Sequence, residues 1–422
     1  MLSLQFIRTH PDLVRRGAEI KGYPVPLDEI LELDRQHRIL LTRSETLKAE
    51  RNAASNQLVH HKEPQLLARM KEISEQVKQM NQEIGGLSER LQDLLLQVPN
   101  LPHESVPVGL SAADNVEVRR WGQARRLEHA PRTHYEIGEM HDVLDFERAV
   151  KIAGSRFAVV KGWGARLERA LIQFMLDLHV VEHGYVEVMP PLLVNRRSMV
   201  GTGNLPKFED EAFHLAQRDL FLIPTAEVPL TNLHAGEILA KEQLPVRYVA
   251  YTPCFRSEAG AAGQDTRGYI RLHQFQKVEM VILSEPERSM EALETLVGHA
   301  EEVLKRLRLP YRVLLMCSGD MGFQQWKKYD IEVWCPGLDR YLEVSSCSNF
   351  GEYQARRAQL RYRPAHGAAP RYLHTLNGSG LASTRTFDAI LENYQRVDGS
   401  VEVPEVLRPY LSGRELLGSP KP

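Results

Sequence analysis

Between residues 27 and 99, apolar side chains recur at alternating intervals of three and four, the spacing of helices that pack along one seam. The first half of the seam contains Ile30, Leu33, Leu40, Leu47, Ala54 and Leu58, with His37, Ser44 and Arg51 at three of its positions. The second half is apolar throughout, at Met70, Ile73, Val77, Met80, Ile84, Leu87, Leu91, Leu94 and Val98. The segment His60-His-Lys-Glu-Pro64 interrupts the pattern, and proline breaks a helix. We therefore predict an antiparallel two-helix coiled-coil arm with about 30 residues per helix, reaching on the order of 45 Å, and expect it to project.

A proline-rich stretch from Val98 to Gly109 ends the arm and marks a domain boundary. We predict one domain at residues 1–108, which contains the arm, and a second at 109–422. The distal part of the arm, 35–78, has nine basic residues against five glutamates, a modest excess suited to RNA phosphates. From the arm alone, a dimerising or purely structural coiled coil is an equally good interpretation.

The second domain mixes helical and strand-like patterns. A helix is predicted from Ala165 to His183, with Gly184 as its stop. Strand-like runs are found at 114–122, 185–188, 247–251, 274–283, 328–334 and 341–344, and a further helix at 386–394. This order predicts an antiparallel sheet flanked by helices, so that the whole chain is an α+β protein with an N-terminal coiled-coil arm.

Composition removes several classes of function. Among 422 residues, 53 Lys and Arg nearly balance 55 Asp and Glu, and a net charge of −2 excludes a general nucleic-acid coat. The four cysteines have neither zinc-ligand nor disulfide spacing, the histidines have no metal-ligand spacing, and no zinc is expected. No apolar run approaches the roughly 20 residues of a membrane helix. With no signal-peptide layout, the cytoplasm is the expected compartment.

The richest stretch for chemistry is 254–280, where a loop carries Arg256, Arg267 and Arg271 between two strand-like runs. Guanidinium groups pair bidentately with phosphate oxygens, so the loop suits a polyphosphate, although a solvated hairpin is the simpler alternative. Neither a P-loop nor a complete dinucleotide-binding glycine motif is present in the sequence. Any ATP site must therefore use another architecture.

This stretch closely resembles motif 2 of the class II aminoacyl-tRNA synthetases, in the form seen in bacterial-type seryl-tRNA synthetases. The helix and strand before Pro190 resemble motif 1, which builds the family's dimer interface, and Leu376 to Arg385 resembles motif 3. Three stretches match the seryl enzymes in particular: 200–208, 224–232 and 343–350. The resemblance covers the chain from end to end, and the class I motifs are absent.

The resemblance implies that a homodimer activates L-serine with ATP to form seryl-adenylate and transfers serine to the 3′ end of tRNA-Ser, and of tRNA-Sec as well. Activation is an in-line attack of a carboxylate on the α-phosphorus, so positioning and charge neutralisation do most of the work. The implied catalytic residues are Arg256 at the α-phosphate, Glu279 at the amino acid and Arg385 at the γ-phosphate.

By the same resemblance, the ATP site consists of Arg256, Ser257, Glu258, Arg271, Leu272, Phe275, Glu343, Val344, Ser345, Ser346 and Arg385. Phe275 stacks on adenine, and Glu343 with Ser346 supplies oxygen ligands to Mg²⁺. The serine site consists of Thr225, Ala226, Glu227, Glu279, Asn377 and Ser379. Taken singly, each is ordinary: Glu227 and Glu279 would be surface carboxylates, and Arg385 a solvated residue at a helix start.

The chain departs from the family pattern at Ser383-Thr384, at Gln264 and at Gln325-Trp326, and a β-branched Thr384 at a tight strand-to-helix turn raises a question about local geometry. Two alternatives exist. An amino acid:carrier-protein ligase on the same catalytic domain would lack the long arm. A non-catalytic RNA-binding paralogue would have lost Arg256, Glu279, Glu343 or Arg385, and all four are present.

Overall fold

The computed structural model describes residues 1–58, 64–124, 127–259 and 268–418. The chain divides into two compact units, Met1–Pro99 and Asn100–Pro422. The predicted turn at 60–63 lies outside the described residues, and so do Gln264 and Arg267 of the arginine-bearing loop. Among the helices of the described ranges, none combines the length and the apolarity needed to cross a bilayer.

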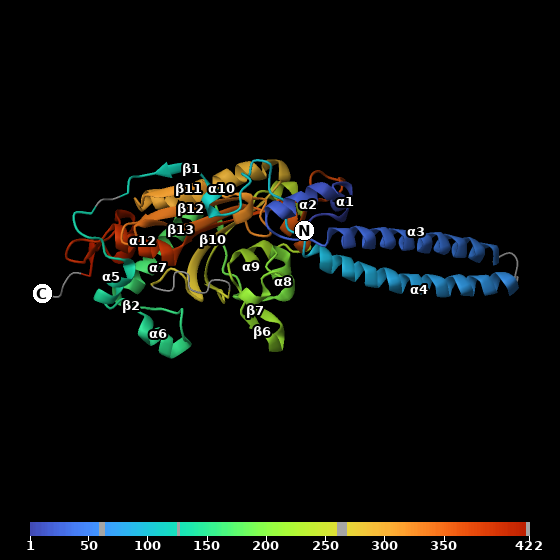
Figure 1. Ribbon diagram of the computed structural model, residues 1–422, viewed down its shortest axis with the longest axis horizontal. Helices are drawn as coiled ribbons and strands as arrows, with labels where there is room; N and C mark the ends of the chain where they lie inside the picture. Colours follow the sequence, from blue (N-terminus) through green and yellow to red (C-terminus); the bar gives the residue numbers. More distant parts are fainter. Residues whose placement is uncertain (59–63, 125–126, 260–267, 419–422) are drawn as a thin grey trace. The chain divides into compact units, whose positions relative to one another are not determined.

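The first unit is built around two antiparallel helices, α3 (Leu27–Leu58) and α4 (Pro64–Leu95), which follow α1 (Leu4–Thr9) and α2 (Pro11–Ile20) (Figure 1). Predicted seam residues such as Ile30, Ala54 and Ile73 are buried, which confirms the helix pair. Two of the three polar seam residues meet polar partners on the opposite helix: His37 Nε2 lies 3.1 Å from Ser88 Oγ, and Ser44 Oγ donates to Asn81 Oδ1 at 3.3 Å. The pair formed by the buried Ser44 favours a single register of the two helices, because a shift would leave its hydroxyl without this partner.

In the described part of the second unit, eight strands form one sheet in the order β1-β11-β12-β13-β16-β10-β9-β4. Neighbours are antiparallel except β4 and β9, which are parallel. The strands are β1 (Val116–Trp121), β4 (Val186–Glu187), β9 (Val246–Phe255), β10 (Gln274–Ser284), β11 (Tyr311–Leu315), β12 (Lys327–Cys335), β13 (Arg340–Asn349) and β16 (His374–Ala382). The predicted α+β class, with a mainly antiparallel sheet, is confirmed.

Helices cover one face of this sheet. Val278, Met280 and Ile282 alternate along β10 and join the main hydrophobic core with residues of α7 (Gly162–Asp177), α10 (Ser289–Arg306) and α12 (Ser383–Asn393) (Figure 1). Because side chains alternate between the two faces of a strand, Phe275 and Lys277 point to the other face. That second face carries the candidate site.

Shorter elements surround the sheet. The remaining helices are α5 (His134–Met140), α6 (Phe146–Ala153), α8 (Arg196–Thr202), α9 (Glu227–Asn232) and α11 (Tyr353–Ala358). The short strands are β2 (Leu144–Asp145) with β3 (Val159–Val160), β5 (Leu193–Asn195) with β7 (Leu220–Leu222) and β6 (His214–Leu215), β8 (Ile238–Ala240) with β14 (Arg361–Arg363) and β15 (Arg371–Tyr372), and β17 (Val401–Glu402) with β18 (Leu416–Leu417).

Two local predictions differ from the observed elements. The helix predicted to reach His183 is α7 followed by a π-helical turn at Leu178–Glu182, and Gly184 ends it with φ +70°. The expected tight turn before Arg385 does not exist, because β16 runs directly into α12. Thr384 is therefore already helical, in the first turn of α12, where a β-branched residue has no unusual backbone to adopt.

Candidate active site

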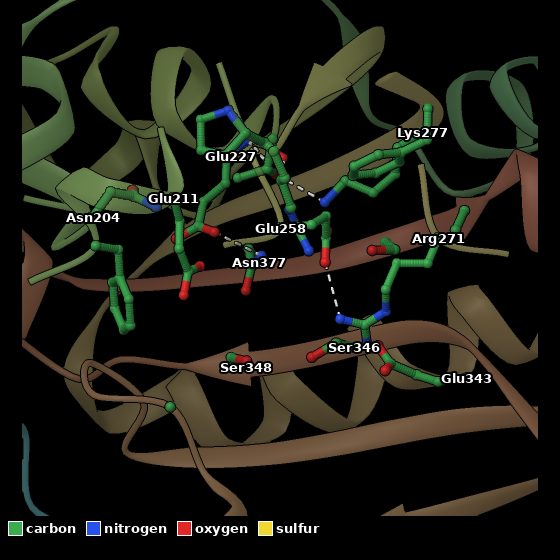
Figure 2. Close-up of a pocket in the computed structure, with 18 of the residues that line it drawn as sticks. Asn204, Glu211, Glu227, Glu258, Arg271, Lys277, Glu343, Ser346, Ser348 and Asn377 are labelled. Atoms are coloured by element: carbon green, nitrogen blue, oxygen red, sulfur yellow. Dashed lines mark hydrogen bonds and ion pairs between the residues drawn. The ribbon is translucent and has the colours of Figure 1, made fainter. Parts of the chain in front are cut away.

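A cavity of about 600 Å³ opens on the face of the sheet opposite α7, α10 and α12 (Figure 2). Its floor comes from β10, β13 and β16, and its walls come from the segments around residues 204–212, 224–227, 256–258, 270–272 and 322–325 and from the start of α12. Figure 2 shows carboxylate, amide, hydroxyl and cationic side chains from these elements pointing into the same space. The volume falls in the range of small-molecule sites, and the lining suits a charged ligand.

Two β-bulges determine which residues face the cavity. In β13, Ser345 pairs with Ile331 and Glu343 pairs with Glu332, so Val344 is an extra residue. In β16, Ser379 pairs with Glu279 and Leu381 with Val278, which makes Gly380 the extra residue. Residues three apart normally lie on opposite faces of a strand, but a bulge brings them to the same face. Glu343 and Ser346 therefore share the cavity face, as do Ser379 and Ala382.

One end of the cavity is built from two buried carboxylates that converge on one amide. Asn377 Nδ2 donates to Glu279 Oε1 at 2.7 Å and to Glu227 Oε2 at 3.0 Å. Gln354 Nε2 donates to the other oxygen of Glu227 at 2.6 Å. Both hydrogens of the Asn377 amide are thus used, which fixes the orientation of this side chain and of the carboxylates around it.

A lysine sits beside these carboxylates. Lys277 Nζ forms an ion pair with Glu279 Oε2 and lies 2.8 Å from Thr225 Oγ1. Burial, together with the negative charge of Glu279, raises the pKa of Glu227 to about 7. The group therefore contains two carboxylates, of which one is only partly ionised at neutral pH, and a single ammonium. This balance leaves room for one more cation, such as the ammonium group of an amino acid.

The other end of the cavity is cationic. Arg256 is exposed, with its guanidinium 5.1 Å from the centroid of the Phe275 ring, and Arg271 Nη1 lies 2.9 Å from Glu258 Oε2. Arg385 Nη1 donates to the Glu343 carbonyl oxygen at 2.8 Å, and its Nε donates to the Ile270 carbonyl oxygen at 3.3 Å. Fixed guanidinium groups around one space are the arrangement that binds a polyphosphate.

A divalent cation fits beside these arginines. Partial burial opposes the ionisation of Glu343, but Arg385 and Lys328 outweigh it and lower the pKa of this carboxyl, which keeps it charged. Ser346 lies on the same face of β13. In the described residues no group of three or more His, Cys, Asp and Glu side chains could hold a metal by itself. One carboxylate with one hydroxyl suits Mg²⁺, which usually takes its remaining ligands from phosphates and water.

The cavity brings together most of the residues proposed from the sequence. Those that line it are Thr225, Glu227, Arg256, Glu258, Arg271, Leu272, Phe275, Glu343, Val344, Ser346, Asn377, Ser379 and Arg385. Four others lie behind the surface or away from it. Glu279 and Ala226 are fully buried, Ser345 Oγ donates to the Ser379 carbonyl oxygen at 2.6 Å, and Ser257 Oγ donates to the Asp210 carbonyl oxygen at 2.7 Å.

Several lining residues were not predicted. Lys277 and Lys328 are the most important, because each adds a cation to the site. A signal for Lys277 existed: it lies two positions from both Phe275 and Glu279 on one strand, so all three share a face. Lys328 is 3.1 Å from Asp330 Oδ2, and only the bulge at Val344 brings this pair next to Glu343. Glu211 also lines the cavity and carried no signal.

Comparison with known proteins identifies the family. Residues 1–102 match the seryl-tRNA synthetase N-terminal domain, and residues 207–394 match the class II tRNA synthetase core domain (G, H, P, S and T). The chain is 57% identical to a serine–tRNA ligase of Caldanaerobacter subterraneus subsp. tengcongensis over 97% of this chain and 98% of that one. It is 54% identical to a serine–tRNA ligase of Nitratidesulfovibrio vulgaris (strain Miyazaki F) over 98% of this chain and 99% of that one.

Solved structures agree with the sequence matches. The seryl-tRNA synthetase from Pyrococcus horikoshii complexed with ATP superposes with a TM-score of 0.93 at 39% identity, covering 99% of each chain. A prolyl-tRNA synthetase from Giardia lamblia, at 14% identity and a TM-score of 0.57, covers 66% of this chain and 57% of that one and shares the fold. The chain belongs to the serine–tRNA ligases, the ATP-dependent class II aminoacyl-tRNA synthetases that join serine to its tRNA.

Proposed function

We propose that the cavity carries out serine activation, with the amino acid at the carboxylate end and ATP at the cationic end. The observation that carries this assignment is the division of charge around the cavity: Glu227, Glu279 and Asn377 form one hydrogen-bonded group at one end, whereas Arg256, Arg271 and Arg385 surround the other end. Serine is a zwitterion, so its ammonium and carboxylate need opposite charges. A pocket with anions on one side and cations on the other orients the carboxylate towards the α-phosphate.

Arg256 is the residue that neutralises both reacting anions, the serine carboxylate and the α-phosphate. It is exposed and lies next to the serine pocket, because Arg256 Nε donates to the Pro224 carbonyl oxygen at 3.3 Å. Phe275 supplies a flat ring for the adenine, with Arg271 at the other face and Glu258 and Leu272 at the base edge. Arg385, held by two carbonyl oxygens, points to the γ-phosphate. Lys328 adds a further cation near the phosphates.

Glu343 and Ser346 would hold Mg²⁺ together with the ATP phosphates. When bound, the ion would neutralise phosphate charge and favour departure of pyrophosphate. Lys328 and Arg385 already lie next to Glu343, so the protein contributes fixed positive charge at the same place. Val344, as the extra residue of the bulge, is what allows both oxygen ligands to face the ion.

Selection of serine rests on hydrogen bonding in the same pocket. Thr225, Glu227, Glu279 and Ser379 offer polar groups to the ammonium and the hydroxyl, and Ala226 is fully buried behind them. Alanine and glycine would leave some of these groups unpaired, which costs much more than a lost contact with an apolar wall. Threonine must be excluded by its extra methyl group.

The first unit, with the arm, would bind the tRNA. Arg43, Lys71 and Lys78 are exposed and form no ion pair within the described residues, whereas Arg69 is paired with Glu50 and Glu72. Unpaired cations on a long helical surface suit the spaced phosphates of an RNA helix. The serine acceptors that we propose are tRNA-Ser and tRNA-Sec. We also propose that residues 1–108 form the tRNA-binding domain.

We propose that the enzyme acts as a homodimer in the cytoplasm. Val181, Val186 and Met189 are large exposed apolar side chains on and around β4, the strand at the end of the sheet and part of the stretch that resembles motif 1. A second copy would cover them. The four cysteines are buried and free, which fits a reducing compartment.

Charging of defined transcripts tests the acceptor assignment. The protein should transfer labelled serine to transcripts of tRNA-Ser and tRNA-Sec and not to a tRNA-Leu transcript, and periodate oxidation of the terminal ribose should abolish the product. Failure with tRNA-Sec alone would restrict the assignment to tRNA-Ser. Transfer to all three transcripts would contradict the proposal that the arm selects the tRNA.

A further inference from the structure

His134 is a fully buried histidine that belongs to none of the three motifs. It is the first residue of α5, and Thr133 caps this helix by accepting from the Glu136 backbone N–H while Glu136 Oε2 accepts from Thr133 N. Its imidazole lies between α12 and the segment in which the arginine-bearing loop returns to β10. The activation chemistry proposed above does not use it.

The hydrogen bonds of His134 define one tautomer. Glu392 on α12 accepts from His134 Nδ1 at 2.8 Å and from His134 N at 3.0 Å, and its second oxygen accepts from Gly337 N at 2.8 Å and Leu338 N at 3.1 Å. A carboxylate can only accept, so Nδ1 carries the proton. On the other side of the ring, the Tyr269 backbone N–H donates to Nε2 at 3.3 Å. In this geometry Nε2 acts as an acceptor, and the imidazole bridges a carboxylate to a peptide group. Burial alone would lower the pKa of His134, but the charges of Asp388 and Glu392 outweigh it and raise the pKa overall.

The backbone at Gly268 packs closely against the imidazole ring of His134. Gly268 has φ +83°, and a Cβ atom at this position would lie 2.3 Å from His134 Nε2. Asp388 Oδ2 is 3.7 Å from Nε2, beyond hydrogen-bond distance, and burial raises the pKa of Asp388 to about 7, which reduces its pull on a second proton. The Tyr269 peptide is thus the partner of Nε2.

The next residue connects this contact to the ATP site. The carbonyl oxygen of Ile270 accepts from Arg385 Nε at 3.3 Å, and Ile270 also lines the cavity. The side chain of Tyr269 is fixed as well, since its hydroxyl donates to Glu168 Oε2 at 2.9 Å. A path of direct contacts therefore leads from Glu392 through His134, the Tyr269 peptide and the Ile270 carbonyl to the guanidinium of Arg385.

We propose that His134 is a positioning residue for ATP: it holds the Tyr269–Ile270 segment so that the Ile270 carbonyl aims Arg385 at the phosphates. This inference rests on the proposed contact between Arg385 and ATP. It assigns His134 no direct contact with either substrate. Loss of the Nε2 acceptor should therefore change the affinity for ATP and leave the affinity for serine unchanged.

Two amide substitutions separate the two sides of the ring. In His134→Asn, the amide nitrogen takes the place of Nδ1–H towards Glu392, but no atom replaces Nε2. In His134→Gln, the longer side chain brings its amide oxygen to the position of Nε2 and restores an acceptor for the Tyr269 N–H. His141→Asn is the matched control, because His141 caps the other end of α5 and contacts the Gly399 carbonyl oxygen at 2.8 Å.

The test measures equilibrium binding of ATP in the presence of Mg²⁺ by the full-length protein, together with KM for serine and thermal melting. All assays are run well below the lowest melting temperature. His134→Asn should weaken ATP binding about five- to tenfold, the effect of one lost hydrogen bond to an otherwise intact site. His134→Gln and His141→Asn should stay within about twofold of the parent, and KM for serine should stay within about twofold in all three.

A double-mutant cycle with Arg385→Ala distinguishes this inference from the proposed role of Arg385. If His134 acts through Arg385, His134→Asn should add less than about twofold in the Arg385→Ala background. Unchanged ATP affinity in Arg385→Ala alone would refute the role of Arg385. Weakened binding in Arg385→Ala, but normal binding in folded His134→Asn, would overturn the inference about His134. So would an undiminished effect in the double variant, an equal rise in KM for serine, or a folded His134→Gln that binds ATP poorly.

Discussion

Replacement of Glu279 by glutamine removes one charge from the serine pocket and keeps the shape of the side chain. Glu279 is fully buried, accepts from Asn377 Nδ2 at 2.7 Å and forms an ion pair with Lys277. In the variant, the serine ammonium would lose a charged partner and would face an unpaired Lys277. A charge-assisted hydrogen bond contributes about 1.5–3 kcal/mol, and repulsion between the serine ammonium and the unpaired ammonium of Lys277 adds to this loss. We expect kcat/KM for serine to fall by about 10²- to 10³-fold.

Glu227→Gln is the matched comparison because the two carboxylates share the same amide. The pKa of Glu227 is about 7, raised by burial and by the charge of Glu279, so at pH 6 this side chain is mostly a neutral acid. An amide then replaces a neutral group, and the loss in kcat/KM for serine should stay below about tenfold at pH 6. Above pH 7 the parent gains the second carboxylate, and the loss caused by Glu227→Gln should increase.

Serine-dependent ATP–pyrophosphate exchange at pH 6 and pH 8 gives KM for serine and for ATP in both variants. Thermal melting shows whether the unpaired Lys277 destabilises the fold in Glu279→Gln. KM for ATP should change little, and discrimination against alanine should decrease with the loss of serine affinity. A loss below tenfold in Glu279→Gln, or equal losses in both variants at pH 6, would refute the assignment of these two carboxylates.

Further outcomes follow from the same site. Arg256→Ala should reduce adenylate formation by about 10²- to 10³-fold with an unchanged melting temperature, and near-normal pyrophosphate exchange would contradict its role. Residues 45–80 can be replaced by a short turn, because Ser44 and Asn81 face each other across the two helices. This deletion should spare serine activation but abolish tRNA charging. Retained charging would exclude the arm as the part that recognises the tRNA. Because the folded pKa of Glu227 exceeds its ordinary 4.5, unfolding experiments should show stability falling as pH rises from about 4.5 to 7, and Glu227→Gln should remove part of this decline. An equally steep decline in that variant would mean that Glu227 does not titrate there.

The sequence was most informative where a pattern repeats or where chemistry needs a particular residue. The three-four spacing located α3 and α4, including the polar seam residues His37 and Ser44, because the same face of a helix must be buried along its length. Arg256 and Arg385 were identified by their motifs, and both line the cavity. Alternation along β10 also places Lys277 on the same face as Phe275 and Glu279, although Lys277 was not among the predicted site residues.

What the sequence could not reveal depends on register and on distant contacts. Nothing local marks Val344 as the extra residue of a bulge, yet this bulge decides that Glu343 and Ser346 share a face. The pairing of His134 with Glu392 joins residues that lie far apart in the chain, and no periodicity encodes it. Ser257 was placed with ATP by resemblance, whereas its hydroxyl donates to the Asp210 carbonyl oxygen, a contact set by the packing of a neighbouring loop.

The assignment of serine activation to this one cavity is best tested by ATP–pyrophosphate exchange with each of the twenty amino acids, with Mg²⁺ and without tRNA. We expect rapid exchange with serine, little with threonine and alanine, no requirement for tRNA, and loss of exchange in Arg256→Ala. Exchange that requires tRNA, that is as fast with alanine as with serine, or that survives Arg256→Ala would contradict this assignment.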